Sequence, residues 1–298
     1  MKAGFIGVGL MGGPMCRNLI KKGNPAVIFD ISKDALERMK SVGATVASSA
    51  REVAAQCDVV FTSLPMPADV EKVILGADGI AAGAKKGMIV VDMSTNSPAV
   101  VQRLSKELAA KGVVLLDAPV SGGVDGAEAA TLAIMCSGDK AAYDKVKPML
   151  DCMGKNVFHL GAIGMGNVAK LVNNMVSFCN LAIANEAMAL AQRAGLDPAT
   201  MADVMQTASG DSAALKRVKR KAIHGDFKAE FALNLAYKDL GLALDLGRET
   251  GTPLAFGAYT YTLMQQARAK QRGGEDVSTL LRNLEEGMAD TIRSKRKP

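Results

Sequence analysis

The stretch that decides the fold is GFIGVGLMGG, residues 4–13, near the start of the 298-residue chain. It places the spaced glycines Gly7, Gly9 and Gly12 directly after an apolar run typical of a strand and at the start of a helical run over residues 11–22. In such a strand-turn-helix unit the first glycine permits the tight bend, the second lets backbone amides approach a pyrophosphate, and the third allows the helix to pack on the strand. The phosphates would lie at the positive N-terminus of the helix. The stretch predicts a dinucleotide-binding turn, and we expect the cofactor to contact Gly7, Val8, Gly9, Leu10, Met11 and Gly12.

An aspartate in the next apolar run indicates which dinucleotide binds. Asp30 closes the run AVIFD at residues 26–30. A carboxylate at this place can accept hydrogen bonds from the adenosine ribose of NAD, whereas it would repel the 2′-phosphate of NADP. The following residue is Ile31 rather than an arginine, although Lys33 is close. We therefore expect NAD, with NADP less favoured.

The alternation of elements predicts the fold class. From Met1 to about His159, short β-rich runs alternate with helical stretches, and each run is bounded by Gly, Pro, Ser or Asn: AGFIG, AVIFD, DVVFTSL, MIVVD, VVLLD, LAIMC and NVFHL. This is the pattern of βαβ units and a largely parallel sheet. In open sheets of this type ligands bind beyond the carboxyl ends of the strands. The strand-end loops at Leu64-Pro65 and Ser94-Thr95 are therefore candidates for cofactor contact, with Leu64, Pro65 and Thr95 as the expected ligands.

After Gly161 the strand pattern stops and the chain is helical by period. The first helix is long, over residues 164–194, and further helices are predicted from Asp197-Pro198 and near 212–223, 230–249, 253–271 and 276–290. The predicted fold class is α/β, with an N-terminal Rossmann doubly wound sheet (residues 1–162) and an all-α C-terminal domain (residues 163–298) joined by a long helix.

The start of the long helix, GMGNVAKLVNN at residues 164–174, carries the clearest chemistry. Lys170, Asn173 and Asn174 stand at i, i+3 and i+4, on one helical face. Their neighbours are apolar, so the ammonium is expected to be partly desolvated, which disfavours its charged form and suits proton transfer. Lys170 is a candidate acid/base residue and the two asparagines are candidate substrate ligands. The structural alternative is a lysine whose stem runs along the helix to reach water.

A glycine-rich loop follows the strand VVLLD. In APVSGGVDG, residues 118–126, Ser121, Gly122 and Gly123 can present a hydroxyl and consecutive backbone amides to one anionic group. A carboxylate would suit it. The alternative is an ordinary glycine turn.

Composition and charge exclude several classes of protein. The chain is 49% hydrophobic, which suffices for globular cores. Its most apolar stretch, residues 171–191, is interrupted by asparagines and a glutamate, so we expect no membrane span. The five cysteines form no CxxC pair and the two histidines are far apart, so we expect neither a disulfide framework nor a metal site. The N-terminal pattern is unlike a secretory signal, and we expect a cytoplasmic location.

The net charge of +6 is concentrated in residues 216–221 and 293–297. With no Trp and few other aromatic residues there is little material for stacking bases, so nucleic-acid binding is not expected. The first basic cluster is either a solvated helix face above an apolar stripe or a positive rim that attracts anionic ligands. Asp211 precedes this helix, and we expect it to act as the N-cap rather than to meet a substrate amine or hydroxyl.

Five ordered segments together resemble the β-hydroxyacid dehydrogenase family, the group of 3-hydroxyisobutyrate dehydrogenases and tartronate semialdehyde reductases. They are GFIGVGLMGGPM, DMSTNSP, DAPVSGGVDGAEAATL, GMGNVAKLVNN and LAYKDLGLAL, and they span essentially the whole chain. The resemblance implies a Rossmann domain, a linking helix and an all-α domain that builds homodimers or homotetramers. One departure is Ala130, which stands where a glycine is usual in the family.

The resemblance also implies roles for the site residues. Lys170 would be the catalytic lysine, Asn174 a substrate contact, and Ser121 to Gly123 the loop that binds the substrate carboxylate, so Lys170, Ser121 and Asn174 form the expected catalytic set. Thr95 and Lys238 would line the nicotinamide end of the cofactor. The implied reaction transfers a hydride between NAD(H) and a small anionic 3-hydroxy acid or semialdehyde.

Among substrates we rank 3-hydroxyisobutyrate and glycerate or tartronate semialdehyde first, with 4-hydroxybutyrate, sulfolactaldehyde and hydroxymethylglutarate-type acids behind. The decarboxylating phosphogluconate dehydrogenases are disfavoured because they are longer and have histidine in place of Asn173. Imine reductases are disfavoured because they generally lack the lysine. A non-enzymatic alternative is an NAD-sensing or chromatin-associated module, which the two basic clusters alone would favour.

Overall fold

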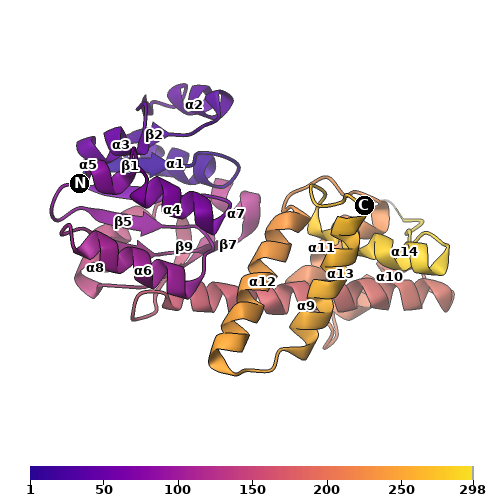
Figure 1. Ribbon diagram of the computed structural model, residues 1–298. Coiled ribbons are helices and arrows are strands. Elements are labelled where there is room, and N and C mark those ends of the chain that lie inside the picture. Colours follow the sequence, from indigo (N-terminus) through magenta and orange to yellow (C-terminus); the bar gives the residue numbers. More distant parts are fainter. Residues whose placement is uncertain (297–298) are drawn as a thin grey trace. The chain divides into compact units, whose positions relative to one another are not determined.

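The computed structural model describes residues 1–296 (Figure 1). The chain divides into two compact units, Met1–Lys170 and Leu171–Pro298. The division falls within one helix, α9, Met165–Arg193. Each unit has its own hydrophobic core, and the two are described in turn.

The first unit is built on a six-stranded sheet in which every pair of neighbours is parallel. Its strand order is β3-β2-β1-β4-β5-β6, which is a doubly wound arrangement that starts from a central β1. The predicted fold class is confirmed. The strands are β1 Ala3–Ile6, β2 Ala26–Phe29, β3 Thr45–Val46, β4 Val59–Thr62, β5 Ile89–Asp92 and β6 Val114–Asp117.

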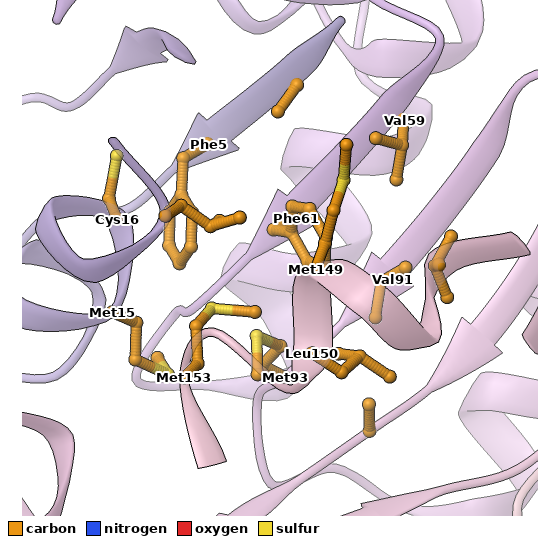
Figure 2. Close-up of a cluster of buried hydrophobic side chains, with 14 of the residues drawn as sticks. Phe5, Met15, Cys16, Val59, Phe61, Val91, Met93, Met149, Leu150 and Met153 are labelled. Atoms are coloured by element: carbon orange, nitrogen blue, oxygen red, sulfur yellow. The ribbon is translucent and has the colours of Figure 1, made fainter. Parts of the chain in front are cut away.

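Alternate residues of each central strand point to opposite faces of this sheet, and helices cover both faces. Phe5 and Phe61 belong to one core cluster, together with methionines of α1 and α8 (Figure 2). Ile6 and Val60 belong to another cluster, with residues of α3, α4 and α6. The helices of this unit are α1 Gly12–Lys21, α2 Lys33–Lys40, α3 Ala50–Gln56, α4 Pro67–Leu75, α5 Ile80–Gly83, α6 Pro98–Ala109, α7 Gly123–Glu128 and α8 Lys140–Leu150.

The last two β-rich runs of the predicted sheet form a second, smaller sheet. It has the order β7-β8-β9, with β7 Val120–Ser121, β8 Leu132–Cys136 and β9 Gly154–His159. β7 and β8 are antiparallel, whereas β8 and β9 are parallel. Only the short helix α7 separates β7 from β8, so the chain turns back on itself there and does not make the longer crossover that a parallel neighbour requires.

The second unit is helical in its described residues, as the sequence predicts. Its core combines α9 residues such as Phe178 and Met188 with Leu215, Leu240 and Met264 from three later helices. After α9 follow α10 Pro198–Gln206, α11 Ala213–Arg220, α12 Leu233–Thr250, α13 Ala255–Ala269 and α14 Leu281–Met288, with short 3-10 turns at Ala222–His224 and Val277–Leu280. Among residues 1–296, no helix has the length and apolar character needed to cross a membrane.

The basic cluster at residues 216–221 lies on α11 and just beyond it, and its charges are neutralised locally. Leu215 and Val218 are buried beneath it. Each basic residue of the cluster forms an ion pair with a carboxylate: Lys216 with Asp211, Arg217 with Asp276, Lys219 with Asp203, Arg220 with Glu230, and Lys221 with Asp226. The cluster is thus a paired helix face rather than a positive rim. The N-cap of α11 is Ser212, whose hydroxyl accepts from the Leu215 N–H at 3.0 Å, so the expectation for Asp211 was wrong.

Candidate active site

The strands of the large sheet end level with one another, and this brings the predicted cofactor loops to one edge. Ile6 is paired with Phe29 and Thr62, Thr62 with Asp92, and Asp92 with Asp117. The segments that follow these five residues contain the glycine turn, Asp30, Leu64-Pro65, Thr95 and the Ser121 to Gly123 loop. The carboxyl edge of the sheet therefore carries all the expected ligands that lie between residues 7 and 123.

The glycine turn has the steric properties that a dinucleotide site needs. Gly7 has a φ of +84°, and a methyl group added to it would lie 2.3 Å from the Ser63 carbonyl oxygen. A methyl group on Gly12 would lie 1.8 Å from the Gly7 carbonyl oxygen, so only glycine fits where α1 starts. A methyl group on Gly9 would meet nothing within 4 Å, which leaves the backbone open to an approaching pyrophosphate. Met11, the N-cap of α1, makes no side-chain capping bond to the first-turn amides.

Asp30 is fixed against this turn. Its Oδ2 accepts from the Val8 N–H at 2.7 Å and its Oδ1 accepts from the Ser32 N–H at 2.8 Å. Each carboxylate oxygen has a further lone pair, so the group can still accept from ribose hydroxyls. The next side chain, Ile31, is 95% exposed and carries no charge. The glycine turn and the Asp30 carboxylate together fit the binding of an adenine dinucleotide.

The two strand-end loops are joined by a serine. The Leu64 N–H donates to the Ser94 Oγ at 2.9 Å, and the Ser94 N–H donates to Asp92 Oδ1 at 3.1 Å. Thr62 Oγ1 also donates to Asp92 Oδ1, at 2.8 Å. Burial raises the pKa of Asp92, and the hydrogen bonds from Ser94 and Thr62 oppose that rise. Thr95 thus follows a buried, hydrogen-bonded segment.

The loop predicted to hold the substrate carboxylate begins at the end of β7. Gly122 and Gly123 have φ angles of +136° and +66°, conformations that side chains disfavour. A methyl group on Gly123 would meet nothing within 4 Å, so the start of α7 has an open side. Ser121 precedes them at the end of the strand and is half-buried.

Lys170 and Asn174 lie one turn apart on α9, and both are buried, at 9% and 6% exposure. Neighbouring Asn173 is exposed, and its Nδ2 donates to Asn174 Oδ1 at 3.2 Å. Lys170 is thus largely shielded from solvent as a residue.

An aspartate that sequence reasoning missed lies between two of the expected residues. Asp239 on α12 is 3% exposed; its Oδ2 accepts from Asn174 Nδ2 at 2.7 Å and its Oδ1 lies 3.0 Å from Lys238 Nζ. A sequence signal existed, since Asp239 interrupts the buried stripe of Ala236, Leu240 and Ala243. A carboxylate in a buried stripe requires partners.

The two units divide the expected residues between them. The first holds the cofactor ligands of residues 7–95, the Ser121 to Gly123 loop and Lys170, whereas the second holds Asn173, Asn174 and Lys238. Within the second unit, Asn174 and Lys238 are brought together by Asp239.

The histidines and cysteines of the described residues show no metal site: no group of three or more His, Cys, Asp or Glu side chains there could hold an ion. His159 lies against the Tyr143 ring, and its Nε2 is 3.0 Å from the Gly138 carbonyl oxygen, which is a structural role. All five cysteines are free thiols.

Two family models match the chain in succession. Residues 2–161 match the NAD binding domain of 6-phosphogluconate dehydrogenase, and residues 164–284 match the NAD-binding domain of NADP-dependent 3-hydroxyisobutyrate dehydrogenase. With the glycine turn and the doubly wound sheet, this pair of domains defines an NAD(P)-dependent dehydrogenase that acts on CH–OH donors.

The chain is also similar to individual proteins over nearly its whole length. The chain is 40% identical over 287 residues to 2-(hydroxymethyl)glutarate dehydrogenase of Eubacterium barkeri, covering 96% of this chain and 95% of that protein. It is also similar to the crystal structure of 3-hydroxyisobutyrate dehydrogenase from Salmonella typhimurium, with a TM-score of 0.88, 32% identity, and coverage of 95% and 99% of the two chains. The structure of Psf3 in complex with NADP+ and 2-OPP gives a TM-score of 0.87 at 29% identity, with 95% and 99% covered. The chain belongs to the β-hydroxyacid dehydrogenase family.

Proposed function

We propose that this enzyme oxidises a small 3-hydroxy acid of the form HOCH₂–CH(R)–COO⁻ to its semialdehyde with NAD, and catalyses the reverse reduction, with Lys170 as general acid/base. The observation that carries the proposal is the buried Lys170 one helical turn from Asn174, itself held by Asp239. Residues 1–162 would bind the dinucleotide, and residues 163–298 would provide substrate ligands and form the oligomer.

The chemistry assigned to Lys170 is proton transfer. When bound, NAD supplies the nicotinamide C4 that accepts a hydride from the carbinol carbon. Neutral Lys170 takes the hydroxyl proton as the C–H bond breaks and the C=O bond forms, so the acid becomes a semialdehyde and the lysine becomes an ammonium. In reduction the ammonium returns that proton to the forming alkoxide. Oxidation requires the neutral amine as the base, and reduction requires the ammonium as the acid.

Recognition of the substrate carboxylate is assigned to the loop of Ser121, Gly122 and Gly123. Its serine hydroxyl and the amides at the open start of α7 offer donors, which is what an anionic group requires. Asn174 offers its second Nδ2 hydrogen, and Asn173 lies beside it. Thr95 and Lys238 would face the nicotinamide end.

The substrate class follows from what the relatives' named substrates share. 2-(Hydroxymethyl)glutarate and 3-hydroxyisobutyrate are both 3-hydroxypropionates substituted at C2, and they differ only in the group R. We propose 3-hydroxyisobutyrate, in which R is methyl, as the first substrate. Tartronate semialdehyde is the alternative for reduction, because its reduced form carries a hydroxyl as R.

NAD is the proposed cofactor in preference to NADP. Asp30 would repel a 2′-phosphate, and the exposed Ile31 offers it no positive charge. The NADP+ complex of Psf3 and the name of the second family model make NADP the alternative.

One set of assays tests the proposed substrate class and the proposed cofactor. The enzyme is assayed by nicotinamide absorbance with NAD(H) and with NADP(H), on a panel of C2-substituted 3-hydroxypropionates and their semialdehydes. Lys170→Met should bind NADH normally but lose about 10² to 10⁴ in kcat, the usual contribution of a placed acid/base group. Near-normal turnover in Lys170→Met would remove the lysine from the mechanism, and no turnover of any panel member by the unmodified enzyme would refute the substrate class.

We also propose a homodimer or homotetramer. Val176, Ile183 and Leu190 recur every seven residues along α9 and are 51%, 60% and 73% exposed, which forms an apolar stripe suited to a second copy of the same surface. Ile183→Asp should lower the mass measured by light scattering during gel filtration, whereas the exposed change Lys155→Asp should leave it unaltered. A wild-type monomer would contradict the proposal.

A further inference from the structure

A buried polar network lies where α9 begins, and it centres on the carboxylate of Asp117 at the end of β6. Asp117 is fully buried. Its Oδ1 accepts from the Gly164 N–H at 2.8 Å and from the Ser137 hydroxyl. Its Oδ2 accepts from the backbone N–H and the Nδ2 of Asn167, at 2.8 and 3.0 Å. Ser137 Oγ in turn accepts from the Gly166 N–H at 2.9 Å. The backbone amide of Gly164, just before α9, and those of Gly166 and Asn167 in its first turn are thereby tied to Asp117 at the end of β6 and to Ser137 just after β8.

Asn167 extends this network to the loop that carries Thr95. Its Oδ1 accepts from the Asn96 N–H at 2.7 Å, and Asn96 directly follows Thr95. Both Asn96 and Asn167 are fully buried. The amide of Asn167 faces an acceptor on one side and a backbone donor on the other, so its orientation is fixed by chemistry.

We propose that Asn167 is a positioning residue of this dehydrogenase, because its side chain sets the separation between the Thr95 loop and the helical turn that carries Lys170. The inference rests on the proposed function, which gives Thr95 and Lys170 their roles. Lys170 follows Asn167 by three residues, about 4.5 Å along the helix axis, on a neighbouring part of the same face. A shift at Asn167 is therefore transmitted to the lysine through less than one turn.

The start of the helix has little freedom to compensate. A methyl group on Gly166 would lie 2.2 Å from the Met135 carbonyl oxygen and 2.9 Å from Asp117 Oδ2. The helix backbone at Gly166 is therefore in close contact with Met135 and Asp117. Hydride and proton transfer depend on placement of the reacting groups, and a displacement of about 1 Å can cost about 10² in rate.

The test compares Asn167→Asp with Ser137→Ala. Asn167→Asp keeps the shape and the acceptor for Asn96, but it replaces the donor that faces Asp117 with a second carboxylate oxygen. Ser137→Ala disturbs the same carboxylate and the same helical turn without touching the link to Asn96, so it controls for a loss of stability alone. Asn167→Ser is the second variant in case the aspartate version does not fold.

We expect Asn167→Asp to reduce kcat about 10- to 100-fold with a smaller effect on the KM for the hydroxy acid, and to weaken NADH binding measured by nicotinamide fluorescence. Its kcat relative to wild type should recover as the pH falls, because the protonated form of the introduced carboxyl can again donate to Asp117. Ser137→Ala should stay within about threefold of wild type in kcat at temperatures where both variants are folded.

The inference is overturned if Asn167→Asp and Asn167→Ser keep wild-type kcat and NADH affinity, or if Ser137→Ala loses as much kcat as they do. The fluorescence titration needs no turnover. An unmodified enzyme that binds NADH but oxidises no panel substrate would therefore refute the proposed function, while the effect of Asn167 on cofactor binding could still be judged.

Discussion

Asn174 donates a hydrogen bond from its Nδ2 to Oδ2 of Asp239 at 2.7 Å, across 65 residues of sequence. The carboxylate only accepts, so it turns the nitrogen of the amide toward itself and fixes the direction in which the second Nδ2 hydrogen of Asn174 points. The other oxygen of Asp239 lies 3.0 Å from the Lys238 ammonium. One buried acid thus orients two side chains assigned to substrate and cofactor.

Asp239→Asn should lower kcat/KM for the hydroxy acid about tenfold with little loss of stability. The introduced amide can turn either end toward Asn174, so the orientation of Asn174 is no longer fixed, and Lys238 loses a countercharge. Steady-state kinetics and a thermal melt give the two readouts. Asp245→Asn, an exposed change on the same helix, is the control. Wild-type kinetics in Asp239→Asn would show that the orientation of Asn174 is unimportant.

Asp30→Asn should reduce the preference for NAD over NADP about tenfold, measured as the ratio of the two kcat/KM values. The amide keeps an oxygen for the Val8 N–H, but it no longer repels a 2′-phosphate and accepts more weakly from a ribose hydroxyl. Asp34→Asn, an exposed change in the first turn of α2, should leave the ratio unchanged. A wild-type enzyme that prefers NADP would refute the role assigned to Asp30.

Ala130→Gly should stabilise the protein. Ala130 has a φ of +56°, a left-handed conformation that suits glycine and strains a residue with a Cβ atom. Relief of this strain exceeds the entropy cost of glycine by up to about 1 kcal/mol, which would raise the melting temperature by about 2 °C. Ala129→Gly is the matched control: its φ is −79°, so the same change should lower the melting temperature. Equal shifts in the two variants would contradict the explanation.

The buried thiols should resist alkylation. Burial raises the pKa of Cys16 to about 12, of Cys136 to about 12 and of Cys57 to about 11. At pH 8 a thiol of pKa 12 is about 10⁻⁴ thiolate, and the thiolate is the nucleophile. Iodoacetamide should therefore label the native protein only at the half-buried Cys152 and Cys179.

Peptide mass spectrometry can read this labelling before and after unfolding in urea. The unfolded chain, in which all five cysteines should react, is the control. Fast modification of Cys16 in the native protein would show that the first unit opens to solvent.

The features that sequence could predict are those whose cause is local. The glycine turn follows from steric limits within a few residues, and the helix after Asp197 starts where that side chain caps it. The alternation of apolar runs with helical stretches predicted the sheet, and the helical period after Gly161 predicted the helical unit. Both patterns can be recognised within short segments of sequence. β3 and β7, of two residues each, are too short to show any periodicity.

The features that sequence could not predict depend on contacts between distant segments. Asp239 meets Asn174, Asp117 meets Asn167, and Asn96 meets Asn167 only after the sheet and the helices have assembled. Ordinary polar residues provide these bonds, with no motif of their own. The N-cap of α11 is a local exception: Asp211 and Ser212 are adjacent and both are good capping residues, and only the backbone geometry of Ser212 makes it the cap.

Because α9 is continuous through Lys170 and Asn174, the number of residues between them fixes the angle between the two side chains about the helix axis as well as their separation along it. Each residue added to or removed from that turn would rotate everything beyond it by about 100° about the helix axis. Such a change would swing Asn174 out of phase with the lysine while every side chain stayed the same. Length variation between positions 170 and 174 should therefore be far more damaging than most substitutions there.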